Sequence, residues 1–181
     1  MMRHLVVAVV MVCCAGGARP AAQRPTATEH EVKAAYLLSF GKYVQWPAGA
    51  RRSAPAFELC VVGPDPFGAA LDRVVTGSVI GGRGVQARRL STAADAGGCH
   101  VLFVSGSDGR QISELLAALG PADVLTVGDS PQFLARGGMI RFATQGGRVR
   151  FEVNLSNAQA AGLVLSSDLL RVASTVLRER Q

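Results

Sequence analysis

The chain has 181 residues, of which 49% are hydrophobic and 18% charged, and its formal net charge is +6. This length and apolar content support one folded domain and exclude an acidic disordered chain. The positive charge alone would suit a nucleic-acid-binding protein, but the arginines are scattered and no aromatic residues interleave with them, so no nucleic-acid partner is expected.

The first 18 residues have the three parts of a secretory signal peptide. A basic start at Arg3 and His4 precedes an apolar run over residues 5–12, and small residues occupy 15–18. The apolar run is shorter than the roughly 20 residues that a membrane-spanning helix needs. We therefore predict cleavage after Ala18 and export to the periplasm.

Lipid attachment is the alternative fate of this N-terminus. Cys13 and Cys14 are the candidate acceptors, but neither follows the small residue that a lipoprotein signal normally requires. Residues 19–27 are rich in Pro, Ala, Arg and Thr without periodicity, and we expect a flexible lead there. The folded domain is then predicted over residues 28–181.

Helices and strands alternate in the first part of the predicted domain. Thr28 and Glu31 form a capping box before an apolar run with helical spacing, and Pro47 ends that helix. The following elements are predicted as a strand over 56–62, a helix capped by Asp65, strands over 85–90 and 100–105, a helix over 109–119, and a strand over 124–127.

The last third of the sequence indicates an antiparallel hairpin followed by helices. The arms 139–143 and 148–154 flank a Gly146-Gly147 turn, and in the second arm Arg148 and Arg150 alternate with apolar residues. The predicted helices are one capped by Ser130 and ending at Gly137, a short one over 154–161, and a longer one over 166–178. The expected fold class is α/β: a single domain with a mixed β-sheet flanked by helices on both faces, ending in an antiparallel hairpin and a helix.

Only two cysteines, Cys60 and Cys99, remain after the predicted cleavage. In an oxidising compartment two cysteines favour a disulfide, and two independently buried thiols are the alternative. A bridge between them would close a loop of about 40 residues, for which the chain-entropy relation gives about 4 kcal/mol of stabilisation.

The sequence offers few catalytic groups. His30 falls on the exposed first turn of a helix and His100 at a strand entrance, and neither cysteine has the close second ligand of a zinc set. The sequence also lacks a phosphate-binding glycine motif and a nucleophile elbow. We therefore predict a protein that is not an enzyme, with no catalytic residues, metal or cofactor; an enzyme of unknown type is the least favoured alternative.

Five linked motifs resemble the YfiR-like family of periplasmic regulatory proteins over nearly the whole predicted domain. They are AYLLSFGKYVQWP at 35–47, LCVVGPDPFGAALD at 59–72, CHVLFVSGS at 99–107, VLTVGDSPQFLARGGMIRF at 124–142, and RFEVNLSNAQAAGLVLSSDLLRVA at 150–173.

The resemblance implies a periplasmic repressor of an inner-membrane diguanylate cyclase of the YfiN type, acting through the periplasmic sensor domain of that enzyme. It also implies that an outer-membrane lipoprotein of the YfiB type can sequester the repressor, and that the chain forms a homodimer. Cys60 and Cys99 fall where the main disulfide of the family is expected. The second cysteine pair of some relatives is missing here, so redox switching that depends on that pair is not implied.

Two surfaces are candidates for the implied protein contact, the first helix and the C-terminal helix. In the first helix and its end we single out Tyr43 and Trp46 as partner-binding residues, with Trp46 as the exposed aromatic anchor. Tyr36 and Phe40 of the same helix are expected in the core.

A small-molecule-sensing module is the second functional hypothesis. In this reading the loop over residues 63–67 and the polar hairpin arm with Arg148 and Arg150 together bind a small anionic molecule.

Overall fold

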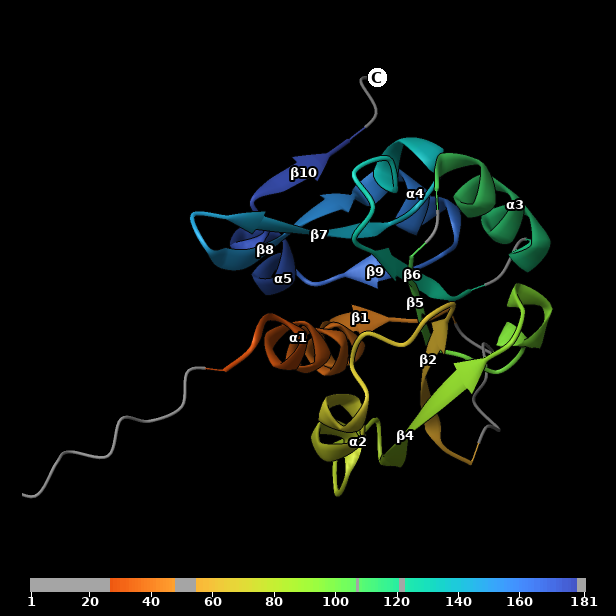
Figure 1. The fold of residues 1–181 in the computed structure, drawn as a ribbon, viewed down its shortest axis with the longest axis vertical. Coiled ribbons are helices and arrows are strands. Elements are labelled where there is room, and N and C mark those ends of the chain that lie inside the picture. Colours follow the sequence, from red (N-terminus) through yellow and green to blue (C-terminus); the bar gives the residue numbers. More distant parts are fainter. Residues whose placement is uncertain (1–26, 48–54, 107, 121–122, 179–181) are drawn as a thin grey trace, which may run out of the picture.

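The computed structural model describes residues 27–47, 55–106, 108–120 and 123–178 (Figure 1). The predicted signal peptide and residues 19–26 of the predicted lead therefore lie outside the described residues. Five α-helices and two short 3-10 helices form in the described part. The α-helices are α1 (Glu29–Tyr43), α2 (Ala69–Val75), α3 (Gly109–Leu119), α4 (Leu155–Ala160) and α5 (Ser167–Val172), and the 3-10 helices are η1 (Ala93–Ala96) and η2 (Leu134–Arg136).

The strands form one large sheet and one small sheet. The strands are β1 (Val44–Gln45), β2 (Phe57–Val62), β3 (Val79–Ile80), β4 (Arg83–Leu90), β5 (Val101–Val104), β6 (Leu125–Gly128), β7 (Ile140–Gln145), β8 (Arg148–Asn154), β9 (Val164–Leu165) and β10 (Thr175–Leu177). In the described residues the eight-stranded sheet has the order β10-β8-β7-β6-β5-β2-β4-β3, and β1 pairs with β9 in the second sheet.

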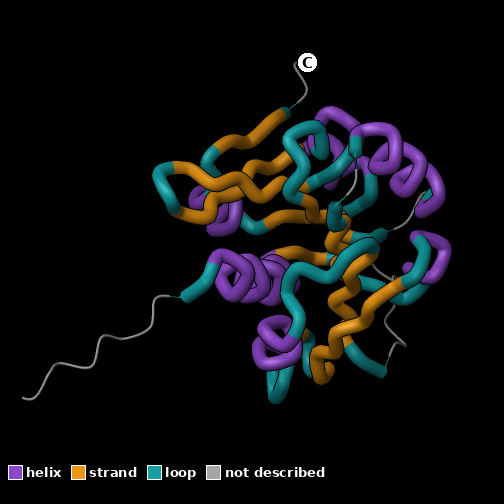
Figure 2. Tube along the Cα trace, in the orientation of Figure 1, coloured by secondary structure: helices purple, strands orange, loops and turns teal. Residues whose placement is uncertain are grey.

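Parallel and antiparallel pairs occur in the same sheet. Strands β4, β2, β5, β6 and β7 run parallel, β8 returns antiparallel to β7, and β10 runs parallel to β8. Figure 2 shows helical segments on both sides of these strands. The sheet is thus mixed, and the predicted fold class, including the hairpin of β7 and β8, is confirmed.

The first helix forms for the local reasons that the sequence indicates. The Thr28 backbone N–H donates to the Glu31 carboxylate at 2.9 Å, and the Glu31 backbone N–H donates to the Thr28 hydroxyl at 3.3 Å. This capping box satisfies N–H groups that have no partner inside the helix. At the other end the chain turns extended at Val44 and pairs with β9 before it reaches Pro47.

Two apolar clusters cover the two faces of the large sheet. Alternate residues of a strand point to opposite faces, and in β2 Leu59 and Val61 belong to one cluster whereas Cys60 and Val62 belong to the other. The first cluster includes buried side chains of α1, α2, α4 and α5, and the second includes those of η1, α3 and η2. Helices therefore cover both faces, as predicted.

An aromatic cluster joins α1 to the C-terminal hairpin. The ring of Phe40 stacks on Phe142 of β7 at a centroid distance of 5.7 Å and meets Phe151 of β8 edge-on at 5.0 Å. Tyr36 lies one helical turn away and contacts Phe151 at 5.5 Å. All three phenylalanine side chains are buried, so this cluster is the packing link between the two ends of the described chain.

The predicted C-terminal helix over 166–178 is wrong in its second half. Helix α5 ends at Val172, and Thr175–Leu177 form strand β10 beside β8. The Ser174 backbone N–H and hydroxyl both donate to the Phe151 carbonyl, at 2.8 Å and 2.9 Å. The open edge of β8 therefore supplies hydrogen bonds that an isolated helical turn would not have.

Two other helix predictions need correction. Helix α2 begins after Gly68, because the Asp65 carboxylate accepts from the Phe67 backbone N–H at 2.7 Å and closes a turn before the helix. The helix predicted from Ser130 is reduced to turns and η2, in which the Phe133 N–H donates to the Ser130 carbonyl at 3.0 Å and the Gly137 N–H to the Leu134 carbonyl at 3.2 Å, each across three residues. The two-residue strands β1, β3 and β9 were not predicted.

Replacement of Phe40 tests the packing link. We expect Phe40→Ala to lower the free energy of unfolding by about 3–5 kcal/mol, because the ring is fully buried among other rings. Val172→Ala is the matched control, since that side chain is 62% exposed. Urea unfolding measures both variants, and equal small losses would contradict the role given to Phe40.

Candidate functional site

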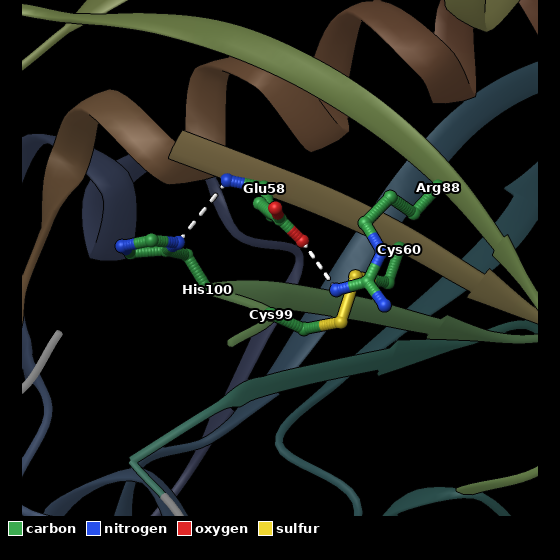
Figure 3. Close-up of a disulfide and its surroundings, with 5 residues drawn as sticks. All are labelled: Glu58, Cys60, Arg88, Cys99 and His100. Carbon is green, nitrogen blue, oxygen red and sulfur yellow. Dashed lines mark hydrogen bonds and ion pairs between the residues drawn. A yellow bond between two sulfur atoms is a disulfide. The ribbon is translucent and has the colours of Figure 1, made fainter. Parts of the chain in front are cut away.

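Cys60 and Cys99 form a disulfide, which confirms the predicted pairing (Figure 3). Their Cα atoms lie 5.9 Å apart, and both side chains are buried. Cys60 lies in β2 and Cys99 lies just before β5, the neighbouring parallel strand. The bridge therefore fastens the entrance of one central strand to the middle of the next.

Three polar side chains surround the bridge (Figure 3). The Arg88 guanidinium donates to the Glu58 carboxylate at 2.6 Å, and the Glu58 backbone N–H donates to His100 Nδ1 at 3.1 Å. On the other side of the ring, the Arg83 guanidinium, which can only donate, lies with its Nη1 3.1 Å from His100 Nε2. The buried His100 thus holds neighbouring strands together, and its Nδ1 lone pair is already used.

The same region contains a group of potential metal ligands. The ligand atoms of Glu58, Cys60 and Cys99 lie within 4.8 Å of one another. Metal ions bind cysteine as thiolate, whereas these two sulfur atoms are bonded to each other. In the oxidised protein this cluster is therefore a structural core and offers no thiolate ligands.

A buried lysine that the sequence analysis missed connects α1 to the end of β6. Lys33 Nζ donates to Glu29 at 2.8 Å and to Asp129 at 3.1 Å, and only 8% of the lysine side chain is exposed. Burial alone would lower the pKa of Lys33, but the hydrogen bonds to the two carboxylates outweigh it and raise the pKa. The hydrogen bond from Lys33 holds the pKa of Glu29 below its ordinary value.

The structure places the two predicted partner-binding residues on different surfaces. Tyr43 is 47% exposed at the end of α1. Trp46 is half-buried, and its ring packs edge-on against Phe57 at 5.4 Å and His100 at 5.9 Å. Trp46 is therefore not the fully exposed anchor that we expected, and its role in partner binding stays a prediction.

Tyr43 lines an apolar groove of about 250 Å³ between α1, α5 and β8. Figure 1 shows α1 and α5 lying side by side beneath the β7–β8 hairpin. We call this feature the α1–α5 groove; its apolar lining is Tyr36, Phe40, Tyr43, Phe151, Leu169 and Val172. It joins the two surfaces that the sequence analysis named separately, the first and the C-terminal helix.

The rim of the α1–α5 groove is well suited to contact another molecule. Tyr43 and Val172 are large apolar side chains left in solvent, at 47% and 62% exposure. The hydroxyl groups of Tyr36 and Tyr43 make no hydrogen bond to other residues in the described ranges. Exposed apolar surface beside unused phenol donors is typical of protein-binding surfaces.

The predicted anion-binding residues do not come together with the loop that was assigned to them. Arg148 and Arg150 lie at the start of β8, whereas residues 63–67 follow β2. Strands β5, β6 and β7 lie between, so the two parts are about 19 Å apart at roughly 4.8 Å per strand. The composite anion site is therefore not formed, and a role of the two arginines in ligand binding stays a prediction.

Helices long and apolar enough to cross a membrane do not occur among the described residues.

Comparisons with known proteins bear on this arrangement. The family described as YfiR/HmsC-like matches residues 30–174. No curated protein matches the chain.

Two solved structures share the fold at low sequence identity. An ABC domain in complex with L-Trp from Streptococcus pneumoniae is 9% identical, with a TM-score of 0.54 over 80% of this chain and 60% of that chain. A conserved domain protein from Vibrio cholerae O1 biovar El Tor is 13% identical, with a TM-score of 0.53 over 82% of this chain and 60% of that chain. The chain thus spans about 60% of the length of these structures, and the likeness shows the fold alone.

Removal of the disulfide tests its structural weight. We expect Cys60→Ala combined with Cys99→Ala to lower the free energy of unfolding by about 4 kcal/mol, because the open chain regains the entropy of a loop with sequence separation 39. Urea unfolding measures the loss, and thiol labelling of the unreduced wild type should find no free Cys60 or Cys99. A loss below about 1 kcal/mol would contradict this account.

The lysine cluster predicts a loss of stability in acid. The stabilisation from Glu29 is fully present above the ordinary pKa of about 4.3 and disappears as the pH falls through its lowered folded-state pKa. In Lys33→Met this contribution is absent, so the unfolding free energies of variant and wild type should converge as the pH falls below the ordinary pKa of Glu29. Arg110→Met, which breaks an exposed pair with Glu114, is the control. Parallel pH curves for Lys33→Met and wild type would contradict the prediction.

Proposed function

The chain belongs to the YfiR/HmsC-like family, and from this membership we propose that it is a periplasmic regulator of cyclic-di-GMP signalling. Its proposed target is an inner-membrane diguanylate cyclase, which it represses by binding the periplasmic sensor domain of that enzyme. An outer-membrane lipoprotein of the YfiB type is proposed to compete for the same chain, and homodimerisation is part of the same proposal.

The observation that carries the proposal is the exposed apolar surface at the α1–α5 groove. Tyr43 and Val172 remain in solvent although the helices that carry them are otherwise packed on the sheet. A partner that covers these side chains removes apolar surface from water, which is favourable. Ser39 and Asp168 add two polar side chains to the lining, and the Asp168 carboxylate pairs with Arg171 at 3.5 Å.

Binding alone is sufficient for the proposed repression. A regulator shifts a membrane enzyme toward an inactive state when it binds that state more tightly than the active one. A shift from 1:99 to 99:1 needs a preference of about 10⁴-fold between the two states. The sensor domain therefore has to present the complementary surface mainly in its inactive conformation.

A pair of substitutions in the groove tests the proposal. We expect Tyr43→Ala combined with Val172→Ala to weaken binding of the purified sensor domain by roughly tenfold or more, because two exposed apolar contacts are lost. In cells the same variant should raise the concentration of cyclic di-GMP. Titration calorimetry and nucleotide extraction measure the two effects.

Val79→Ala is the matched control for this test, since Val79 is 58% exposed and lies in β3 at the other edge of the sheet. It should leave sensor-domain affinity and cyclic di-GMP unchanged. Failure of the wild-type protein to bind the sensor domain at all would contradict the proposed function.

A further inference from the structure

The potential metal ligands around the disulfide come from two neighbouring strands (Figure 3). Glu58 and Cys60 stand two residues apart in β2, so their side chains project from the same face of that strand. Cys99 lies just before β5, the parallel neighbour of β2. One carboxylate and two cysteine sulfur atoms, all within 4.8 Å of one another, suit zinc or another soft divalent metal once the sulfur atoms are thiolates.

The strands that carry these ligands are held together independently of the bridge. The His100 backbone N–H donates to the Glu58 carbonyl at 2.9 Å, and the Glu58 backbone N–H donates to His100 Nδ1 at 3.1 Å. The Cys99 backbone N–H donates to the Ala96 carbonyl at 3.0 Å. These bonds involve no sulfur atom, so they can persist when the disulfide is open and keep the ligands near one another.

The spacing of the two cysteines fits a shared metal ion. Zinc binds thiolates at about 2.3 Å, so two sulfur atoms on one tetrahedral ion lie about 3.8 Å apart. The Cα atoms of Cys60 and Cys99 lie 5.9 Å apart. Rotation about the Cα–Cβ bonds can therefore bring the free sulfur atoms to this spacing without a shift of either strand.

Arg88 orients the carboxylate and balances its charge. It lies opposite Cys60 in β4, and its guanidinium donates to Glu58 Oε2 at 2.6 Å, as hydrogen-bond partners of ligating carboxylates do in metal sites. A divalent ion with two thiolates and one carboxylate keeps one excess negative charge, which the guanidinium neutralises; an unbalanced charge would be costly to bury. Ions can enter from this side, since 20% of the Glu58 side chain and 39% of the Arg88 side chain are exposed.

We propose that Glu58, Cys60 and Cys99 form a zinc site in the reduced protein. The fourth position of the tetrahedral ion is left to a water molecule. Bridge and metal exclude each other, because the two sulfur atoms are either bonded together or bound to the ion. In the metal-bound state the ion takes over the cross-link between β2 and β5. This site is independent of the proposed regulatory function.

Reduction has to precede binding, and a water-soluble phosphine performs it without adding competing thiols. The S–S bond breaks, two thiols form, and the phosphine takes one oxygen atom from water to become the phosphine oxide. Zinc then binds both sulfur atoms and displaces their two protons into solution. A newly made chain, in which the bridge has not yet formed, has the same two thiols and needs no reductant.

Cadmium titration of the reduced protein tests the proposal, because cadmium–thiolate bonds absorb in the ultraviolet. All proteins in the test carry Cys13→Ser and Cys14→Ser, so that Cys60 and Cys99 are the only cysteines. The phosphine is removed by gel filtration under nitrogen before Cd²⁺ is added. We expect one equivalent to bind to the reduced protein and none to the unreduced one.

Glu58→Gln separates a built site from chelation by two thiols alone, and Glu152→Gln is its matched control. Glu152 forms a similar half-buried pair, with Arg141 at 2.6 Å, but in β8. We expect Glu58→Gln to weaken cadmium binding to the reduced protein by about tenfold or more, whereas Glu152→Gln should stay within about twofold of its parent.

A stability measurement keeps the test decisive if the reduced chain is partly unfolded. Zinc should raise the urea midpoint of the reduced parent and of Glu152→Gln, because the ion binds the folded arrangement more tightly than the unfolded chain. The rise should be smaller in Glu58→Gln. Equal cadmium affinities and equal midpoint shifts in all three proteins, or no binding to the reduced parent, would overturn the proposal and leave the proposed regulatory function standing.

Discussion

The contact of Phe40 with Phe142 and Phe151 fixes where α1 lies, and the surface features of the protein depend on that position. The helix stands at the start of the domain, whereas the hairpin that carries the two phenylalanines lies near its end. Once α1 is seated on the hairpin, α5 has a second helix to lie against, and the α1–α5 groove forms between them. A change that releases Phe40 would therefore remove the groove together with part of the core.

A buried lysine and the disulfide add further links between the elements of the fold. The buried Lys33 binds Asp129, which follows β6, and so ties the first half of α1 to the middle of the sheet. The disulfide joins β2 to the entrance of β5 on the other face. These links connect α1, the centre of the sheet and its two faces. Tyr43 and Val172, two side chains left outside this network, are those to which we assign the partner contact.

Local sequence patterns were sufficient to predict much of the secondary structure and the fold class. The Thr28 capping box, the glycine turn at 146–147 and the apolar strands are encoded by neighbouring residues. The strand at Thr175–Leu177 was missed because Leu169, Ala173 and Val176 also fit a helical period, and only the open edge of β8 decides between the two. Burial of Lys33 depends on a residue 96 positions away, so no local pattern reveals it. The first helix and the C-terminal helix were both predicted as contact surfaces. No pattern in the sequence indicated that these two helices border the same groove.

Site-specific photo-crosslinking in intact host cells identifies which protein contacts the α1–α5 groove. A photoreactive phenylalanine analogue is placed at position 43, in the α1–α5 groove, where Tyr43 is 47% exposed. For comparison it is placed at position 79 in β3, where Val79 is 58% exposed. We expect an adduct from position 43 with the periplasmic sensor domain of an inner-membrane diguanylate cyclase, and none from position 79. An adduct with that domain from position 79 alone, or no adduct with it from either position, would contradict binding of the sensor domain at the groove.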